Sequence, residues 1–188
     1  MNGFKEVCFD KFTKKLEKNI KNYEARLNAW QNVKRVYKKD GTDYKNISQN
    51  FEGCKFLKDF RNEFECCVNY INYNGETCTD IISLHQTTEN LPFEPKKDQE
   101  ILGGCGWKPY IILDADQLEI MINNLIKNYQ NYLEEAKKEY QKGVELFPQF
   151  WNKLDDLAKF IYENTENKNQ ISLNYAFIDV IKEQFNIN

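Results

Sequence analysis

Apolar side chains recur at helical spacing through the first forty residues. The apolar positions are Phe9, Phe12, Leu16, Ile20, Tyr23, Leu27, Trp30, Val33 and Tyr37. Successive positions are three or four residues apart, with a mean step of 3.5. A stripe with this period is typical of an amphipathic helix that packs along its length against another helix. We expect this helix to run from Phe4 to Lys39 and to end at Asp40–Gly41, because glycine readily takes the left-handed conformation common after a helix.

The pattern changes to that of β-strands in the middle of the chain. After a polar stretch, residues 42–50, residues 63–73 read EFECCVNYINY, in which alternate apolar side chains share one face. Asn74–Gly75 then leads into a second β-prone run, TCTDIISL, and an Asn-Gly pair between such runs is a strong hairpin signal. Residues 83–98 contain two prolines and should form an exposed loop, and residues 110–113 should add a third strand. We therefore expect a sheet of about three antiparallel strands.

The last part of the chain has a helical pattern. Asp116 and Glu119 have the spacing of a capping box before an apolar stripe, which predicts a second long helix ending near Gly143. Pro148 fits the first turn of a third helix. Residues 173–185 should form a short terminal helix, although residues 171–176 could instead pair as a strand.

These patterns predict one α+β domain over residues 1–188. It should contain two long antiparallel helices, a small antiparallel sheet and a helical C-terminal section. The first helix, rich in lysine, lies within residues 1–41, the hairpin and third strand within 60–115, and the helical section within 116–188.

Composition excludes several classes of protein. With 188 residues, 41% of them hydrophobic and 14% aromatic, the chain is long and apolar enough for a globular core, unlike a disordered or collagen-like chain. Mean hydropathy is −0.75 and no stretch approaches the roughly 20 apolar residues of a membrane-spanning helix. The first eight residues lack the apolar segment of a secretory signal. We therefore expect a cytoplasmic protein with no membrane partner.

The net charge of −3 conceals an asymmetry. Residues 1–41 carry 11 basic and 5 acidic side chains, a net charge of +6, so the remainder carries −9. Basic candidates for binding a partner are Arg26, Lys34, Arg35 and Lys38, together with Lys14, Lys15, Lys18 and Lys21, which could follow a phosphate backbone. Acidic candidates are Glu134, Glu135, Glu139, Asp155 and Asp156, which could face a basic groove on a nuclease. Solvated helix faces are the simpler interpretation of both sets.

The sequence YIILDAD, residues 110–116, is the sharpest candidate for chemistry. Two carboxylates, Asp114 and Asp116, follow an apolar strand and could hold a divalent cation. The motif resembles the Asp-x-Asp of glycosyltransferases and the opening motif of haloacid-dehalogenase-type phosphatases. Those phosphatases carry Thr or Val where this chain has Leu118. Helix capping is the simpler interpretation.

The six cysteines do not have the spacing of a zinc site, since no CxxC occurs and His85 is the only histidine. We expect reduced thiols that pack as small apolar side chains. Cys105, in the glycine turn 103–106 before Trp107, resembles the neighbourhood of a cysteine-protease nucleophile, with His85 as its only available base. A tight turn is the simpler interpretation here too.

No coherent catalytic set emerges from these residues, and no cofactor is expected. We therefore expect a non-enzymatic protein that binds a protein or nucleoprotein, with local nucleic-acid contacts through the basic helix. The lysine- and asparagine-rich composition is typical of AT-rich genes and favours a mobile-element source, where such a protein could inhibit a host defence nuclease as anti-CRISPR proteins do. Two alternatives stay open: a metal-dependent phosphoryl- or glycosyl-transfer enzyme using Asp114 and Asp116, and a helical protein that self-associates as a homodimer.

Overall fold

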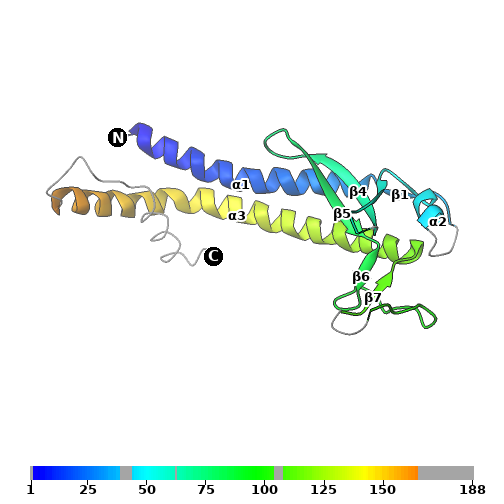
Figure 1. Ribbon diagram of the computed structural model, residues 1–188. Helices are drawn as coiled ribbons and strands as arrows, with labels where there is room; N and C mark the ends of the chain where they lie inside the picture. The colour runs from blue at the N-terminus through cyan, green and yellow to red at the C-terminus, as the bar shows by residue number, and fades with distance from the viewer. Residues whose placement is uncertain (1, 39–43, 62, 104–107, 165–188) are drawn as a thin grey trace. The chain divides into compact units, whose positions relative to one another are not determined.

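The computed structural model describes residues 2–38, 44–61, 63–103 and 108–164 (Figure 1). Contacts divide the chain into two compact units, Met1–Gly143 and Val144–Asn188. The glycine turn around Cys105, the expected helix end at Asp40–Gly41 and the expected terminal helix lie outside the described residues.

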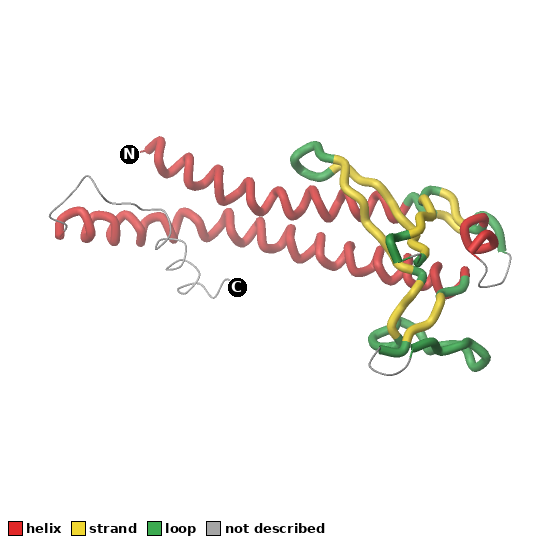
Figure 2. The backbone as a smooth tube through the Cα atoms, viewed as in Figure 1, coloured by secondary structure: helices red, strands yellow, loops and turns green. Residues whose placement is uncertain are grey.

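The chain is a mixture of helices and short antiparallel strands, as predicted (Figure 2). The elements in order are α1 (Asn2–Gln31), β1 (Lys34–Arg35), α2 (Tyr44–Gln49), β2 (Phe51–Glu52), β3 (Lys55–Lys58), β4 (Phe64–Ile71), β5 (Thr77–Ser83), β6 (His85–Thr87), β7 (Tyr110–Ile112) and α3 (Ala115–Asn164). None of the described helices is long and apolar enough to cross a membrane.

The first helix ends earlier than its apolar stripe predicts. α1 stops at Gln31, and β1 then pairs with β2, with Lys34 opposite Glu52 and Arg35 opposite Phe51. The Val36 amide also donates to the Asn50 carbonyl, at 2.8 Å. These long-range hydrogen bonds override the helical period, which continues through Val33 and Tyr37 only by coincidence of spacing.

The predicted hairpin is confirmed. β4 and β5 pair from Ile71 opposite Thr77 to Glu65 opposite Ser83, around a turn in which Gly75 has a φ of +82°. The side-chain oxygen of Asn72 accepts from the amides of Asn74 and Glu76, at 2.9 and 3.0 Å, and holds the turn.

The strand predicted at residues 110–113 is present as β7, but it does not belong to the sheet of the hairpin. The third strand is β3, which pairs with β4 in the order β3-β4-β5. β7 instead pairs with β6 in a separate two-stranded sheet, with His85 opposite Ile112. The predicted loop 83–98 therefore begins with a strand, since the prolines that favour a loop come only at positions 92 and 95.

The long C-terminal helix is present, but both of its predicted limits need correction. α3 is continuous through Gly143 and Pro148 and is 50 residues long, so no new helix opens at Pro148. A glycine inside a helix costs only about 1 kcal/mol relative to alanine, which packing elsewhere can offset. The helix begins at Ala115, and its cap is Asp114 rather than Asp116.

Within the first unit, α1 and α3 run antiparallel, and their side chains contact each other. Arg26 of α1 lies over the ring of Tyr129, and Glu24 pairs with Lys137 at 3.0 Å further along α3. Residues buried between these helices and the sheets form one core. Its most buried side chains include Trp30, Ile111, Leu113 and Leu118, each 0% exposed. The part of the predicted apolar stripe from Tyr23 to Val33 is therefore packed against this core, whereas Tyr37 at its end is exposed.

Candidate functional site

The two carboxylates of the Asp-x-Asp motif lie at the start of α3, and each has a different structural role. Asp114 caps the helix: its Oδ1 accepts from the Gln117 amide at 2.9 Å, and Gln117 Oε1 accepts from the Asp114 amide at 3.1 Å. This reciprocal pair is a capping box, shifted two residues from the one expected at Asp116 and Glu119. A capping box is present as predicted, but it is made by other residues. Two overlapping pairs, Asp114 with Gln117 and Asp116 with Glu119, have the spacing of a capping box in this sequence.

Asp116 and Glu119 both accept hydrogen bonds from Arg35 instead. Nη1 of Arg35 lies 2.5 Å from Asp116 Oδ1 and 2.9 Å from Glu119 Oε2, and the Arg35 side chain is only 6% exposed. The hydrogen bond from Arg35 holds the pKa of the Asp116 carboxyl below its ordinary value. The short strand β1, which the sequence did not predict, brings Arg35 to the start of α3. We call this place, with Asp114, Asp116 and Glu119, the Asp-x-Asp corner.

A second cation completes the ion-pair network at this corner. Lys96 Nζ lies 2.5 Å from Asp114 Oδ2 and 3.6 Å from Asp116 Oδ2. Three carboxylates therefore face two side-chain cations, Arg35 and Lys96. Among the described residues, no group of three or more His, Cys, Asp or Glu is arranged to hold a metal ion. The observed geometry at Asp114 and Asp116 is that of a helix cap and ion pairs.

Arg26, another predicted contact residue, belongs to a second internal network. Its guanidinium stacks over the rings of Tyr70 and Tyr129, and its Nε donates to the Tyr70 hydroxyl at 3.0 Å. Next to it, Asp80 Oδ2 of β5 accepts from Trp30 Nε1 at 2.9 Å and from the Tyr129 hydroxyl at 2.5 Å. Burial and the Asp80 carboxylate raise the pKa of Tyr129. One carboxylate thus joins α1, β5 and α3.

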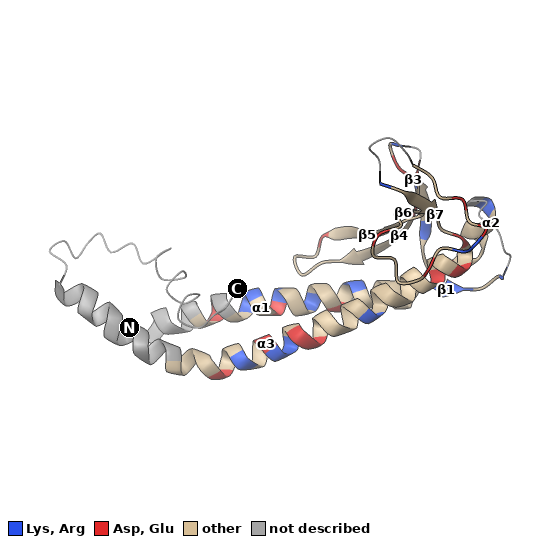
Figure 3. Cartoon of the chain, turned by 90° about the horizontal axis from the view of Figure 1, so that it is seen from below, with Lys and Arg blue, Asp and Glu red and all other residues tan. Residues whose placement is uncertain are grey.

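The exposed lysines of α1 form a different kind of surface. Lys14, Lys15, Lys18 and Lys21 are all exposed, and their spacing places Lys14, Lys18 and Lys21 on one helix face, with Lys15 at its side. We call these four residues the lysine stripe; the basic positions along α1 can be followed in Figure 3. None of the four forms an ion pair with a described carboxylate, although Lys21 lies 5.3 Å from the centre of the Tyr73 ring. The hairpin turn is held beside Lys21, since the Tyr73 amide donates to Asn22 Oδ1 at 2.8 Å.

The remaining basic candidates divide in the structure. Lys34 and Lys38 are exposed, whereas Arg26 and Arg35 are engaged in the two internal networks. Of the predicted basic set, the stripe lysines, Lys34 and Lys38 are therefore the residues that present charge to solvent.

The acidic candidates of α3 do not form a surface of one sign. Glu134, Glu135 and Glu139 are exposed, but Lys137, Lys138 and Lys142 alternate with them along the helix (Figure 3). Asp155 and Asp156 lie in α3, with side chains outside the described part of the chain.

His85 is placed in β6, where its ring stacks on Tyr110 with centroids 5.6 Å apart and its Nδ1 lies 3.9 Å from Glu63 Oε1. Its expected partner Cys105 lies outside the described residues, so their relative position stays a prediction.

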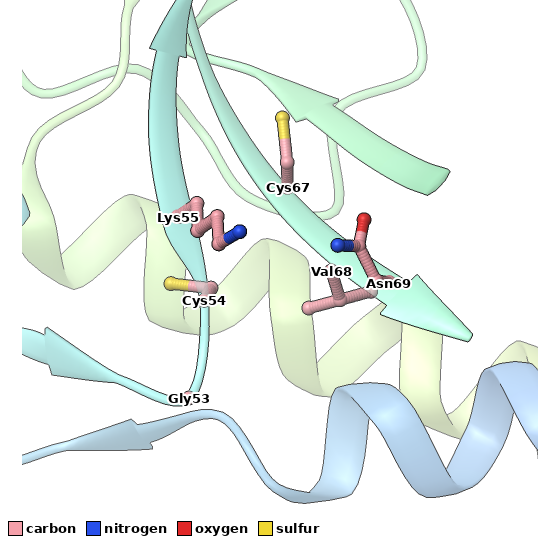
Figure 4. A pocket seen from close by; sticks show the side chains of 6 residues that line it. All are labelled: Gly53, Cys54, Lys55, Cys67, Val68 and Asn69. Carbon is pink, nitrogen blue, oxygen red and sulfur yellow. The ribbon is translucent and has the colours of Figure 1, made fainter. Parts of the chain in front are cut away.

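Sequence reasoning missed a small cavity of about 340 Å³ beside the start of β3. Gly53, Cys54, Lys55, Cys67, Val68 and Asn69 line it (Figure 4). Gly53 has a φ of +85° and approaches the segment between α1 and β1 so closely that a Cβ would lie 2.3 Å from the Asn32 carbonyl oxygen. The sequence could not indicate this site, because Cys54 and Cys67 are seen to lie on neighbouring segments only when the position of β3 is known.

Comparisons with known proteins give no relative. No protein-family model, curated protein or solved structure matches the chain.

Proposed function

We propose that this protein is a non-enzymatic binding protein that contacts a nucleoprotein, with the lysine stripe lying along the phosphates of its nucleic acid. The observation that carries this proposal is that four exposed lysines lie within two turns of α1 and that none of them forms an ion pair with a described carboxylate. Lys14 and Lys21 are about 10 Å apart along the helix axis, which matches the rise of about three base pairs. Lysines placed at this spacing along a helix can reach successive phosphates of a nucleic-acid backbone.

The internal networks support a binding role over catalysis at the Asp-x-Asp corner. Asp114 caps a helix and Asp116 is tied to Arg35, so both carboxylates already have partners that stabilise their charge. A cation entering this corner would have to displace Lys96 and compete with Arg35. The metal-dependent transferase alternative therefore has less support than the binding role.

Within the binding role, we propose inhibition of a nucleic-acid-targeting nuclease, in the manner of anti-CRISPR proteins. This proposal rests on the local positive charge of α1 within a chain of net charge −3, and on the composition typical of AT-rich genes. The dimer alternative has less support, because the buried half of the α1 stripe, including Leu27 and Trp30, packs within the chain.

A cleavage assay tests the inhibitory role. Purified protein is added to a guide-directed nuclease with labelled target DNA, and the fraction cleaved is measured over time. We expect cleavage to slow with the natural protein and to recover when Lys14, Lys15, Lys18 and Lys21 are changed to Gln. The matched control variant has four other exposed lysines, Lys97, Lys127, Lys138 and Lys142, changed to Gln. It has the same net charge as the stripe variant and should still inhibit.

Two results would each overturn one part of this proposal, either the inhibitory role or the contact through the lysine stripe. One is unaffected cleavage across nucleases of several types, together with no nucleoprotein retained from a nuclease-containing lysate. The other is equal inhibition by both lysine variants, which would move the contact away from the stripe.

A further inference from the structure

Cys54 and Cys66, which no sequence motif links, lie near each other where β3 begins beside β4. Cys66 lies opposite Phe56, and Cys67 lies opposite Lys55. Because side chains alternate along a strand, Cys54 and Phe56 share a face with Cys66, whereas Lys55 and Cys67 point to the other face. Cys54, Phe56 and Cys66 accordingly all contact the same core.

The two thiols contact each other across the strand pair. Cys54, the residue just before β3, lies diagonally across from Cys66 of β4, so that the two thiols are near enough to interact. Cys67 is not a competing partner for Cys54: Figure 4 shows their sulfurs pointing in different directions from the two strands. The four cysteines whose side chains are described are all free thiols.

The surroundings give the two thiols different access. Cys66 is 0% exposed, whereas Cys54 is partly exposed and lines the 340 Å³ cavity next to the exposed Lys55. A small oxidant can therefore reach Cys54 first. The interaction between the thiols lowers the pKa of Cys54 and raises that of Cys66, which burial raises further. Cys54 is thus also the better thiolate of the pair.

We propose that Cys54 and Cys66 form a reversible thiol–disulfide site that reacts with small-molecule disulfides such as oxidised glutathione. The Cys54 thiolate attacks one sulfur of the glutathione disulfide, whose S–S bond breaks to release one glutathione thiolate and leave a mixed disulfide on Cys54. Cys66 then loses its proton, which the released glutathione thiolate takes up, and attacks the Cys54 sulfur, releasing the second glutathione as a thiolate. Two protein thiols are oxidised to one disulfide, and one glutathione disulfide is reduced to two thiols.

The disulfide would link the start of β3 to β4 and close a short loop. Because Lys55 carries a positive charge at the mouth of the cavity, anionic disulfides such as oxidised glutathione should react faster than cationic ones such as cystamine. This site is independent of the lysine stripe, so its failure would not affect the proposed binding function.

Peptide mapping of the full-length protein tests the site. The native protein is incubated with oxidised glutathione, remaining thiols are alkylated, and the digested peptides are identified by mass spectrometry. We expect one cross-linked pair, Cys54 with Cys66, that disappears after treatment with dithiothreitol. Cys66→Ala should instead accumulate a glutathione adduct on Cys54, and Cys78→Ser, a matched variant of a partly exposed cysteine in β5, should leave the cross-link unchanged.

The cross-links found in the wild-type protein test the proposal even if a variant folds poorly. A cross-link of Cys54 to any other cysteine, or full alkylation of both Cys54 and Cys66 after exposure to the oxidant, would overturn the proposal. Equal rates with oxidised glutathione and cystamine would overturn the role of Lys55.

Discussion

At the scale of single residues, the first turn of α3 separates two acids that look alike in the sequence. The Asp114 side chain is 11% exposed and caps the helix, whereas the Asp116 side chain is 48% exposed and pairs with Arg35. The difference follows from helix geometry, because the residue just before the first helical turn can reach the free amides and the residue two positions later points outward.

Removing the cap should lower stability without any loss of charge pairing at Arg35. We expect Asp114→Ala to lower the free energy of unfolding by about 1 kcal/mol, since an unsatisfied helix amide typically costs this much. Asp114→Asn should lose less, because Asn is also a good cap and this variant loses only the ion pair with the exposed Lys96. Urea unfolding measures both, with Asp98→Ala, an exposed loop residue, as the control. Equal losses for Ala and Asn would contradict the cap.

The lowered pKa of Asp116 gives a pH dependence of stability. Its charge stabilises the folded protein fully above the ordinary carboxyl pKa of about 3.9, and this contribution is lost as the pH falls through the lower pKa of the folded state. The unfolding free energy of the wild type should therefore fall more steeply below pH about 4 than that of Asp116→Asn. Parallel pH profiles for the two proteins would show that Arg35 does not shift Asp116.

At the scale of elements, Asp80 is the residue that joins the sheet to both long helices. Its Oδ2 accepts from Trp30 of α1 and from Tyr129 of α3. Both donors belong to side chains in the core, at 0% and 6% exposure. Loss of this acceptor would leave the two donors without their partner in a place that water reaches poorly.

Asp80→Ala should therefore cost about 3 kcal/mol of stability, from two buried donors left unsatisfied. Asp80→Asn should cost clearly less, because its amide oxygen can accept both hydrogen bonds. Thermal or urea unfolding measures the difference, and near-ultraviolet circular dichroism should show a changed Trp30 environment in the Ala variant. A cost below about 0.5 kcal/mol for Asp80→Ala, the range of an ordinary surface substitution, would contradict this role.

The elements that the sequence predicts well are those whose signals are local. The Asn74–Gly75 hairpin and the α3 apolar stripe both depend on neighbours within a few residues. β1, β3 and β6 are short strands whose hydrogen bonds come from distant segments, so no local period marks them. The sequence predicts a helix cap at the Asp-x-Asp corner. It does not predict the two cations there, Arg35 and Lys96, because they come from distant parts of the chain.

At the scale of the whole molecule, the charge asymmetry of the sequence becomes more specific. Arg26 and Arg35 are engaged inside the first unit, and the acidic residues of α3 alternate with lysines. The positive charge available to a partner on α1 is therefore mostly that of the lysine stripe. Because the chain as a whole is acidic, contact with a polyanion should be local and sensitive to salt.

The salt dependence of nucleic-acid binding tests this central claim most directly. Fluorescence anisotropy with a labelled oligonucleotide gives the affinity at several salt concentrations for the wild type, the stripe variant and the matched control variant described above. Each phosphate contact contributes about 0.7 to 0.9 to the slope of log affinity against log salt, so loss of four contacts should reduce the slope by about 3. We predict this reduction for the stripe variant, with the control variant close to the wild type. Equal slopes for the stripe and control variants, or no binding by the wild type at low salt, would contradict the account.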